Sequence, residues 1–191
     1  MEKPKAGGDS GKKTRVNIGV GIGVAVAAVV AIALIVSLAS GGDDDSAKSG
    51  SGEAEVVSVD SLREAAAGGK TPVYWAGERQ GTELELSRPE DGRTYVRYLT
   101  DGAKAGDPRA DFLTVGTYAL ENPLAALRRQ GREPGGVLGN APGGATVYFD
   151  QSKPQSVYVA FPGVEAQIEV YDPNFKQALQ LVNSGQIVPI D

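Results

Sequence analysis

The chain of 191 residues contains no cysteine and no histidine, and it has one tryptophan and one methionine. The absence of cysteine excludes disulfides, thiol nucleophiles, thiolate metal sites and lipid-modified cysteine. The absence of histidine excludes a Ser-His-Asp triad and a His-ligated zinc within one chain. Catalysis would have to use carboxylates, Lys, Tyr or Ser, and the sequence shows no nucleophile motif. We therefore expect no catalytic residues, no metal site, no cofactor and no enzymatic activity.

The net charge of −5 is unevenly distributed along the chain. Residues 1–15 carry five basic and two acidic side chains, whereas residues 56–191 carry 13 basic and 17 acidic side chains. Nucleic acid requires a basic protein surface, so the acidic body predicts no nucleic-acid partner.

A long apolar segment follows the basic tail of residues 1–15. No charged residue occurs between Val16 and Gly42. Residues 18–38 would form a helix roughly 31 Å long, which matches the hydrocarbon core of a bilayer. The segment is apolar on every side, unlike a soluble amphipathic helix. Its alternating glycines lack the preceding strand of a dinucleotide-binding loop. The pattern predicts a single transmembrane helix over residues 16–39.

The charges that flank this segment predict its orientation. Lys12, Lys13 and Arg15 precede it and Asp43 is among the acidic residues that follow it. Positive flanks stay in the cytoplasm, which places the C-terminal body outside the cell membrane. The alternative is a cleaved export signal ending near Ala39, which would give a secreted protein. The length of the segment favours the anchor.

Gly19 and Gly23 have the GxxxG spacing that lets two membrane helices approach closely. We interpret them as a possible pairing surface for a homodimer, the alternative being the ordinary frequency of glycine in membrane helices.

A linker rich in Gly, Ser and Asp covers residues 40–55, and residues 56–191 are long enough to bury a core of their own. Helical patterns alternate here with hairpin patterns, which predicts an α+β fold with an antiparallel sheet and helices packed on one face. The expected helices are 58–69, 121–131 and a closing helix 173–184. The expected hairpins are 82–99 and 145–161, and the expected further strands are 111–120 and 165–171.

The order of these elements suggests an internal repeat of helix and three strands, 58–120 and 121–171. A shift of 63 residues places Tyr95 on Tyr158, and a shift of 53 places Tyr118 on Tyr171. Chance similarity of alternating strands remains an alternative. Two such halves would form a groove where they meet, a frequent place for ligands.

Two groups of side chains are candidates for ligand binding. Tyr74 and Trp75 could form an aromatic platform, or anchor the core. Arg128, Arg129 and Arg132 could bind an anion, or complement the dipole at a helix C-terminus.

Glu83 and Glu85 project to the same side of a strand and could act as a pair of catalytic carboxylates. The alternative is a solvated strand face with Arg93 or Arg97 as cross-strand partners.

No specific motif ties the chain to a family, although its layout resembles single-pass, Gly- and Ala-rich envelope proteins of bacteria with GC-rich genomes. The sequence favours a membrane-anchored extracytoplasmic binding or interaction module, whose partner is a protein or a small molecule. Two alternatives remain: a carboxylate-based hydrolase acting on cell-wall material, and a structural accessory subunit of a membrane complex whose sheet edge pairs with a partner.

Overall fold

The structure, a computed structural model, describes residues 54–69 and 71–191. The predicted tail, the predicted membrane helix with Gly19 and Gly23, and nearly all of the predicted linker lie outside these residues. In the part of the chain that the structure describes, none of the helices has the length and apolarity needed to cross a membrane.

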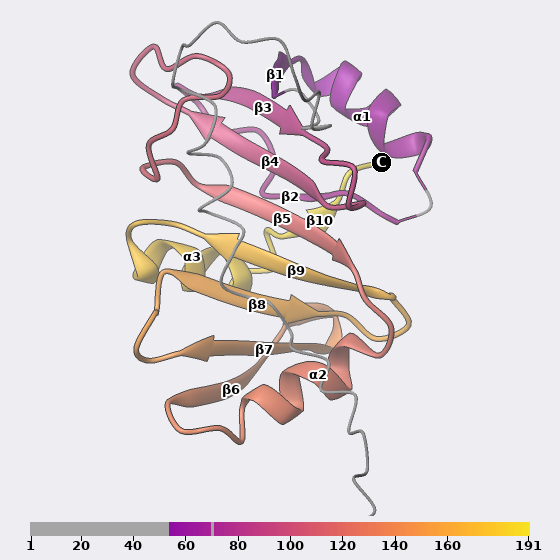
Figure 1. The fold of residues 1–191 in the computed structure, drawn as a ribbon, viewed down its shortest axis with the longest axis vertical. Coiled ribbons are helices and arrows are strands. Elements are labelled where there is room, and N and C mark those ends of the chain that lie inside the picture. The colour runs from indigo at the N-terminus through magenta and orange to yellow at the C-terminus, as the bar shows by residue number, and fades with distance from the viewer. Residues whose placement is uncertain (1–53, 70) are drawn as a thin grey trace, which may run out of the picture.

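The described residues form an α+β fold built on one large antiparallel sheet, as predicted. Its order is β1-β3-β4-β5-β9-β8-β7-β6, and every neighbouring pair is antiparallel. Figure 1 shows these strands stacked from β1 at one end to β6 at the other. Their bounds are β1 Glu55–Val57, β3 Glu83–Ser87, β4 Thr94–Leu99, β5 Thr114–Ala119, β6 Gly136–Ala141, β7 Ala145–Asp150, β8 Ser156–Ala160 and β9 Ala166–Tyr171.

One face of the sheet, here called the apolar face, is covered by two helices and a small second sheet. The helices are α1 (Val59–Ala67) and α3 (Phe175–Asn183), and the small sheet pairs β2 (Tyr74–Trp75) with β10 (Val188–Pro189). These elements bury alternate strand residues together with Leu62 of α1 and Leu181 of α3. This layer holds most of the hydrophobic core.

The third helix, α2 (Pro123–Gln130), packs on the opposite face. The prediction that the helices share one face is therefore wrong for α2. Leu127 of α2 is fully buried against Tyr148 and Tyr158, which alternate along their strands with valines of the apolar face. Because both faces of β7 and β8 carry large apolar groups, each face needs its own cover.

Side-chain caps mark the starts of α1 and α3, whereas α2 starts without one. Ser58 caps α1 by accepting a hydrogen bond from the Ser61 amide. The helix α3 starts at Phe175 rather than at residue 173, because Asn174 caps it by accepting a hydrogen bond from the Lys176 amide. Asn122 precedes α2 in a left-handed conformation and its side chain makes no capping bond.

Two four-stranded halves meet at β5 and β9, the longest-range pairing in the centre of the sheet. Thr114 pairs with Tyr171, and Tyr118 pairs with Gln167. A shift of 53 residues places Thr114 on Gln167 and Tyr118 on Tyr171, so a two-fold axis between β5 and β9 exchanges these two pairs. The helices do not follow this arrangement, since α1 and α2 lie on opposite faces. The duplication itself stays a prediction.

Candidate functional site

The face of the sheet opposite the apolar face carries a continuous row of cross-strand partners. Figure 1 places the strands involved, from β4 to β7, in the middle of the sheet. The row contains Tyr95, Gly116, Glu169, Tyr158 and Tyr148, each paired with the next. We call this side the tyrosine face. Tyrosine suits half-buried strand positions, but here the row surrounds one carboxylate.

That carboxylate, Glu169, is 6% exposed and is surrounded by hydroxyl groups. Its Oε1 accepts hydrogen bonds from Ser156 Oγ at 2.6 Å and from Tyr158 at 3.3 Å. Its Oε2 accepts a hydrogen bond from the Tyr118 hydroxyl. These donors replace water around a buried carboxylate, which would otherwise carry a large desolvation penalty.

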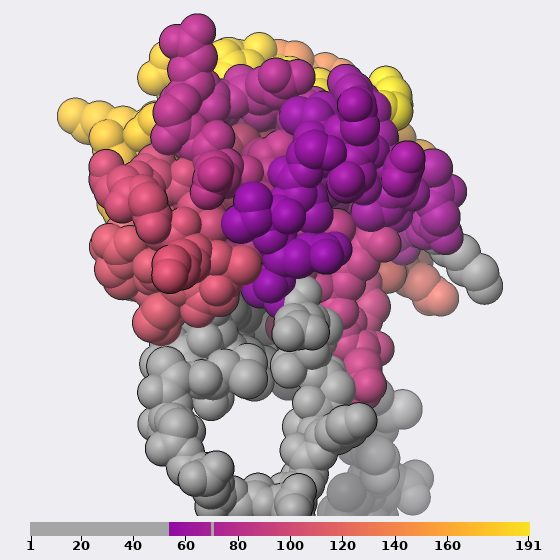
Figure 2. Space-filling view, turned by 90° about the horizontal axis from the view of Figure 1, so that it is seen from above, coloured from indigo at the N-terminus to yellow at the C-terminus, as the bar shows by residue number. Residues whose placement is uncertain are grey.

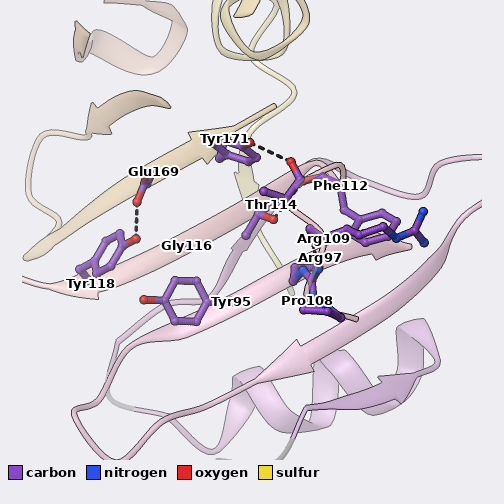
Figure 3. A pocket seen from close by; sticks show the side chains of 11 residues that line it. Tyr95, Arg97, Pro108, Arg109, Phe112, Thr114, Gly116, Tyr118, Glu169 and Tyr171 are labelled. Atoms are coloured by element: carbon purple, nitrogen blue, oxygen red, sulfur yellow. Dashed lines mark hydrogen bonds between the residues drawn. The ribbon is translucent and has the colours of Figure 1, made fainter. Parts of the chain in front are cut away.

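Gly116 allows Tyr118 to reach Glu169. A Cβ atom at Gly116 would lie 2.9 Å from the Tyr118 hydroxyl and 3.1 Å from the ring carbon that bears it. The absence of a side chain at this position therefore lets the Tyr118 ring lie across β5 toward β9. In Figure 3 the ring of Tyr118 lies beside Gly116, with its hydroxyl directed at Glu169.

The loop of residues 100–112, which connects β4 to β5 and is here called the insertion, forms one wall of the site. It is fixed by a buried ion pair, in which Arg97 Nη1 donates to Glu85 Oε1 at 2.8 Å. Glu85 Oε2 also accepts from the Gly106 amide at 2.8 Å, where Gly106 has a positive φ of 77° that favours glycine. Figure 2 looks onto the β1 end of the molecule and shows this insertion as a red bulge near the indigo β1–α1 segment.

Arg97 also binds the backbone of the insertion directly. Its Nη2 donates to the carbonyl oxygens of Asp107 and Arg109, at 2.8 and 3.1 Å. The guanidinium groups of Arg97 and Arg109 lie 5.0 and 5.1 Å from the centre of the Phe112 ring. Such cation–π contacts hold the insertion against the sheet.

A small hollow lies between this wall and the tyrosine row. Figure 3 shows Gly116 and Thr114 between Tyr95 and Tyr118 on one side and the insertion with Phe112 on the other. Its volume is about 30 Å³, which is room for roughly two water-sized groups. The full lining is Tyr95, Arg97, Pro108, Arg109, Ala110, Phe112, Thr114, Gly116, Tyr118, Glu169 and Tyr171.

The tyrosines of the hollow are held in their neutral form. Burial raises the pKa of Tyr118, and the nearby Glu169 carboxylate raises it further. Burial likewise raises the pKa of Tyr95 in the hollow and of Tyr158, which donates to Glu169 from outside the lining. These hydroxyls therefore remain hydrogen-bond donors throughout the physiological pH range.

The predicted aromatic platform lies elsewhere. Tyr74 and Trp75 are 4% and 8% exposed and belong to the core on the apolar face. The Tyr74 ring stacks on Phe161 with 5.3 Å between ring centres. This placement favours the packing alternative, because neither ring presents a surface to a ligand.

The three arginines form an exposed group at the end of α2. Arg128 and Arg129 occupy its last turn and Arg132 follows two residues after it. None of them lines the hollow. Their position at the C-terminus of the helix matches the dipole alternative.

The two glutamates of β3 have different environments. Glu83 is exposed, whereas Glu85 is 1% exposed and bound to Arg97 and Gly106. Arg97 is one of the two cross-strand partners that the sequence suggested, but the pair is buried and not solvated. Within residues 54–69 and 71–191 there is no group of three acidic side chains suited to a metal ion.

Sequence reasoning missed Glu169 and treated the tyrosines as ordinary strand residues. A usable signal was present in the repeat register, which equated Tyr95 with Tyr158 and Tyr118 with Tyr171. In the structure Tyr95 pairs with Gly116 and Tyr158 pairs with Glu169. Tyr118 and Tyr171 line the hollow.

Comparisons of the chain with protein families, with curated proteins and with solved structures find no match.

Proposed function

We propose that the protein is a binding module, tethered outside the cytoplasmic membrane by residues 16–39, and that it captures its ligand at the hollow of the tyrosine face. The observation that carries the proposal is the convergence of aromatic rings and one buried carboxylate on a cavity over β4, β5 and β9. Concave sites with few, well-placed polar groups are typical of ligand binding. The volume of about 30 Å³ admits one small chemical group of a larger ligand.

The tether is supported by the apolar segment and its flanking charges alone. Its test is protease treatment of intact cells that express the full chain with a C-terminal epitope. Loss of the epitope without lysis supports an exposed domain on an anchored chain. Protection of the epitope until lysis would overturn the orientation, and recovery of a soluble protein starting near residue 40 would overturn the anchor.

The binding site is tested by thermal unfolding of the full-length protein in detergent, with a set of small cationic, neutral and anionic compounds. Trp75, the single tryptophan, reports unfolding. A ligand of the hollow raises the unfolding temperature of the wild type and not that of Thr114→Leu, which places extra carbon atoms in the hollow. Gly139→Ala, on the exposed strand β6, is the matched control. Equal shifts in Thr114→Leu and wild type would place the ligand elsewhere.

A second candidate function, an accessory subunit, is favoured by the edge strand β6. Gly136–Ala141 carries no charged residue, and β7 is its one strand partner among the described residues. Uncharged edges are templates for addition of a strand. Because the chain has no cysteine, Asn140→Cys gives a single cross-linking site. A cross-linked partner in cells supports this function, and exclusive recovery of monomer contradicts it.

A further inference from the structure

The arginines around the hollow are paired with carboxylates, whereas Glu169 has no basic partner among the described residues. Three arginines line it or adjoin it, and each is paired with its own carboxylate: Arg97 with Glu85, Arg109 with Asp107 and Arg93 with Asp91. Glu169 differs, because no lysine or arginine of the described residues forms an ion pair with it. The lining therefore carries one negative charge that these pairs do not neutralise.

The hydrogen bonds of Glu169 come from hydroxyl groups alone. Three hydroxyls donate to its two oxygens, and a carboxylate has about four acceptor positions. Two residues before Glu169, on the same face of β9, Gln167 is 5% exposed and its Oε1 has no hydrogen-bond partner among the described residues. This part of the tyrosine face thus has acceptors in excess of donors.

The aromatic rings around the hollow add a further preference for positive charge. Tyr95 and Tyr118 meet edge to face with 5.9 Å between ring centres, and Tyr171 and Phe112 lie across the hollow from them. Ring faces attract cations, and a desolvated ring does so more strongly than an exposed one. Tyr171 is fixed by its hydrogen bond to the Ala110 carbonyl at 2.8 Å.

From this geometry we infer that the hollow binds an organic ammonium group, with the aromatic rings against its carbon atoms and Glu169 as its counter-ion. A primary ammonium at the end of an alkyl chain matches the chemistry and the size, since the head is water-sized and the chain leaves through the open side. The inference rests on the proposed function of this hollow and specifies its ligand class.

The test is calorimetric titration of the full-length protein with three probes of equal length: n-butylammonium, 1-butanol and butyrate. The ammonium is expected to bind at least ten times more tightly than the other two. Glu169→Gln keeps an oxygen acceptor for the hydroxyls but removes the charge, and it is expected to weaken ammonium binding at least tenfold. Glu83→Gln is the matched control, because Glu83 is exposed and does not line the hollow.

A second variant protects the test against misfolding of Glu169→Gln. Tyr95→Leu removes one aromatic ring, leaves every hydroxyl donor of Glu169 in place, and is expected to weaken ammonium binding at least threefold. Binding of butanol or butyrate in preference to the ammonium, or ammonium binding that is unchanged in both variants, would overturn the ammonium assignment and leave the binding site standing. Absence of all ligands, including those of the thermal screen, would overturn both proposals.

Discussion

Glu85 and Arg97 face each other across β3 and β4 and form an ion pair of 2.8 Å in which both side chains are at most 3% exposed. The pair does more than join two strands. Glu85 binds the amide of Gly106 and Arg97 binds the carbonyls of Asp107 and Arg109, so the same two residues fix the insertion that walls the hollow. An ion pair on one face of the sheet thereby also holds this loop in place.

Removal of one partner should be strongly destabilising. Glu85→Ala leaves the Arg97 charge buried without its partner, and we expect a loss of about 3–5 kcal/mol in the free energy of unfolding. Denaturant unfolding followed by Trp75 fluorescence measures it. Asp60→Ala, which breaks the exposed Asp60–Arg63 pair, should change stability by less than about 1 kcal/mol. Equal effects of the two variants would contradict the role given to the buried pair.

Gly116 should tolerate a methyl group less well than a glycine of the edge strand. In Gly116→Ala the Tyr118 ring must move and its hydrogen bond to Glu169 is lost, so we expect a loss of about 1–3 kcal/mol. In Gly139→Ala the nearest atom outside the local chain is 4.0 Å away, and we expect a change within about 0.5 kcal/mol. The same unfolding experiment compares them, and a stable Gly116→Ala protein would show that the ring does not need this space.

Stability should fall as the solution becomes alkaline. Burial raises the pKa of Tyr98 to about 12, and burial raises the pKa of Tyr118 and Tyr158 as well. In the unfolded chain these phenols ionise near pH 10, so the unfolded state loses protons first. The stabilisation is complete below about pH 10 and is lost as pH rises through the folded-state pKa values. Absorbance of tyrosinate at 295 nm should show a group of phenols that ionise only on unfolding. Smooth ionisation of all tyrosines near pH 10 in a folded protein would contradict this.

At low pH, the titration of Asp107 should test the contacts within the insertion. Hydrogen bonds from Arg109 lower the pKa of Asp107 to about 2. A lowered carboxyl pKa contributes stability above about pH 3.9 that is lost as pH falls through the folded-state value. We therefore expect the Asp107 carboxyl carbon to titrate with a midpoint at about pH 2 in a ¹³C NMR titration, and Arg109→Gln to return this midpoint toward the ordinary range. An unchanged Asp107 titration in Arg109→Gln would show that this arginine does not set it.

The sequence by itself determined the α+β class and the antiparallel hairpins. These features depend on neighbours in the chain: alternation of apolar residues and turn residues between strands. The apolar segment of residues 16–39 is likewise a local property, and it is the basis for the proposal that the protein is anchored in a membrane.

Only the tertiary structure decided which side of the sheet each helix covers and where the hollow lies. The position of α2 depends on its packing against Tyr148 and Tyr158, and the local periodicity of the sequence does not predict this contact. Gly116 and Glu169 are 53 residues apart and meet because β5 pairs with β9, a contact with no trace in the local pattern. The alternation of the strand was compatible with a solvated Glu85, whereas in the structure the insertion packs on Glu85 and the Gly106 amide donates to its carboxylate. Burial of a polar side chain is set by what packs on it from elsewhere in the chain, and for that reason the candidate site emerged from the fold.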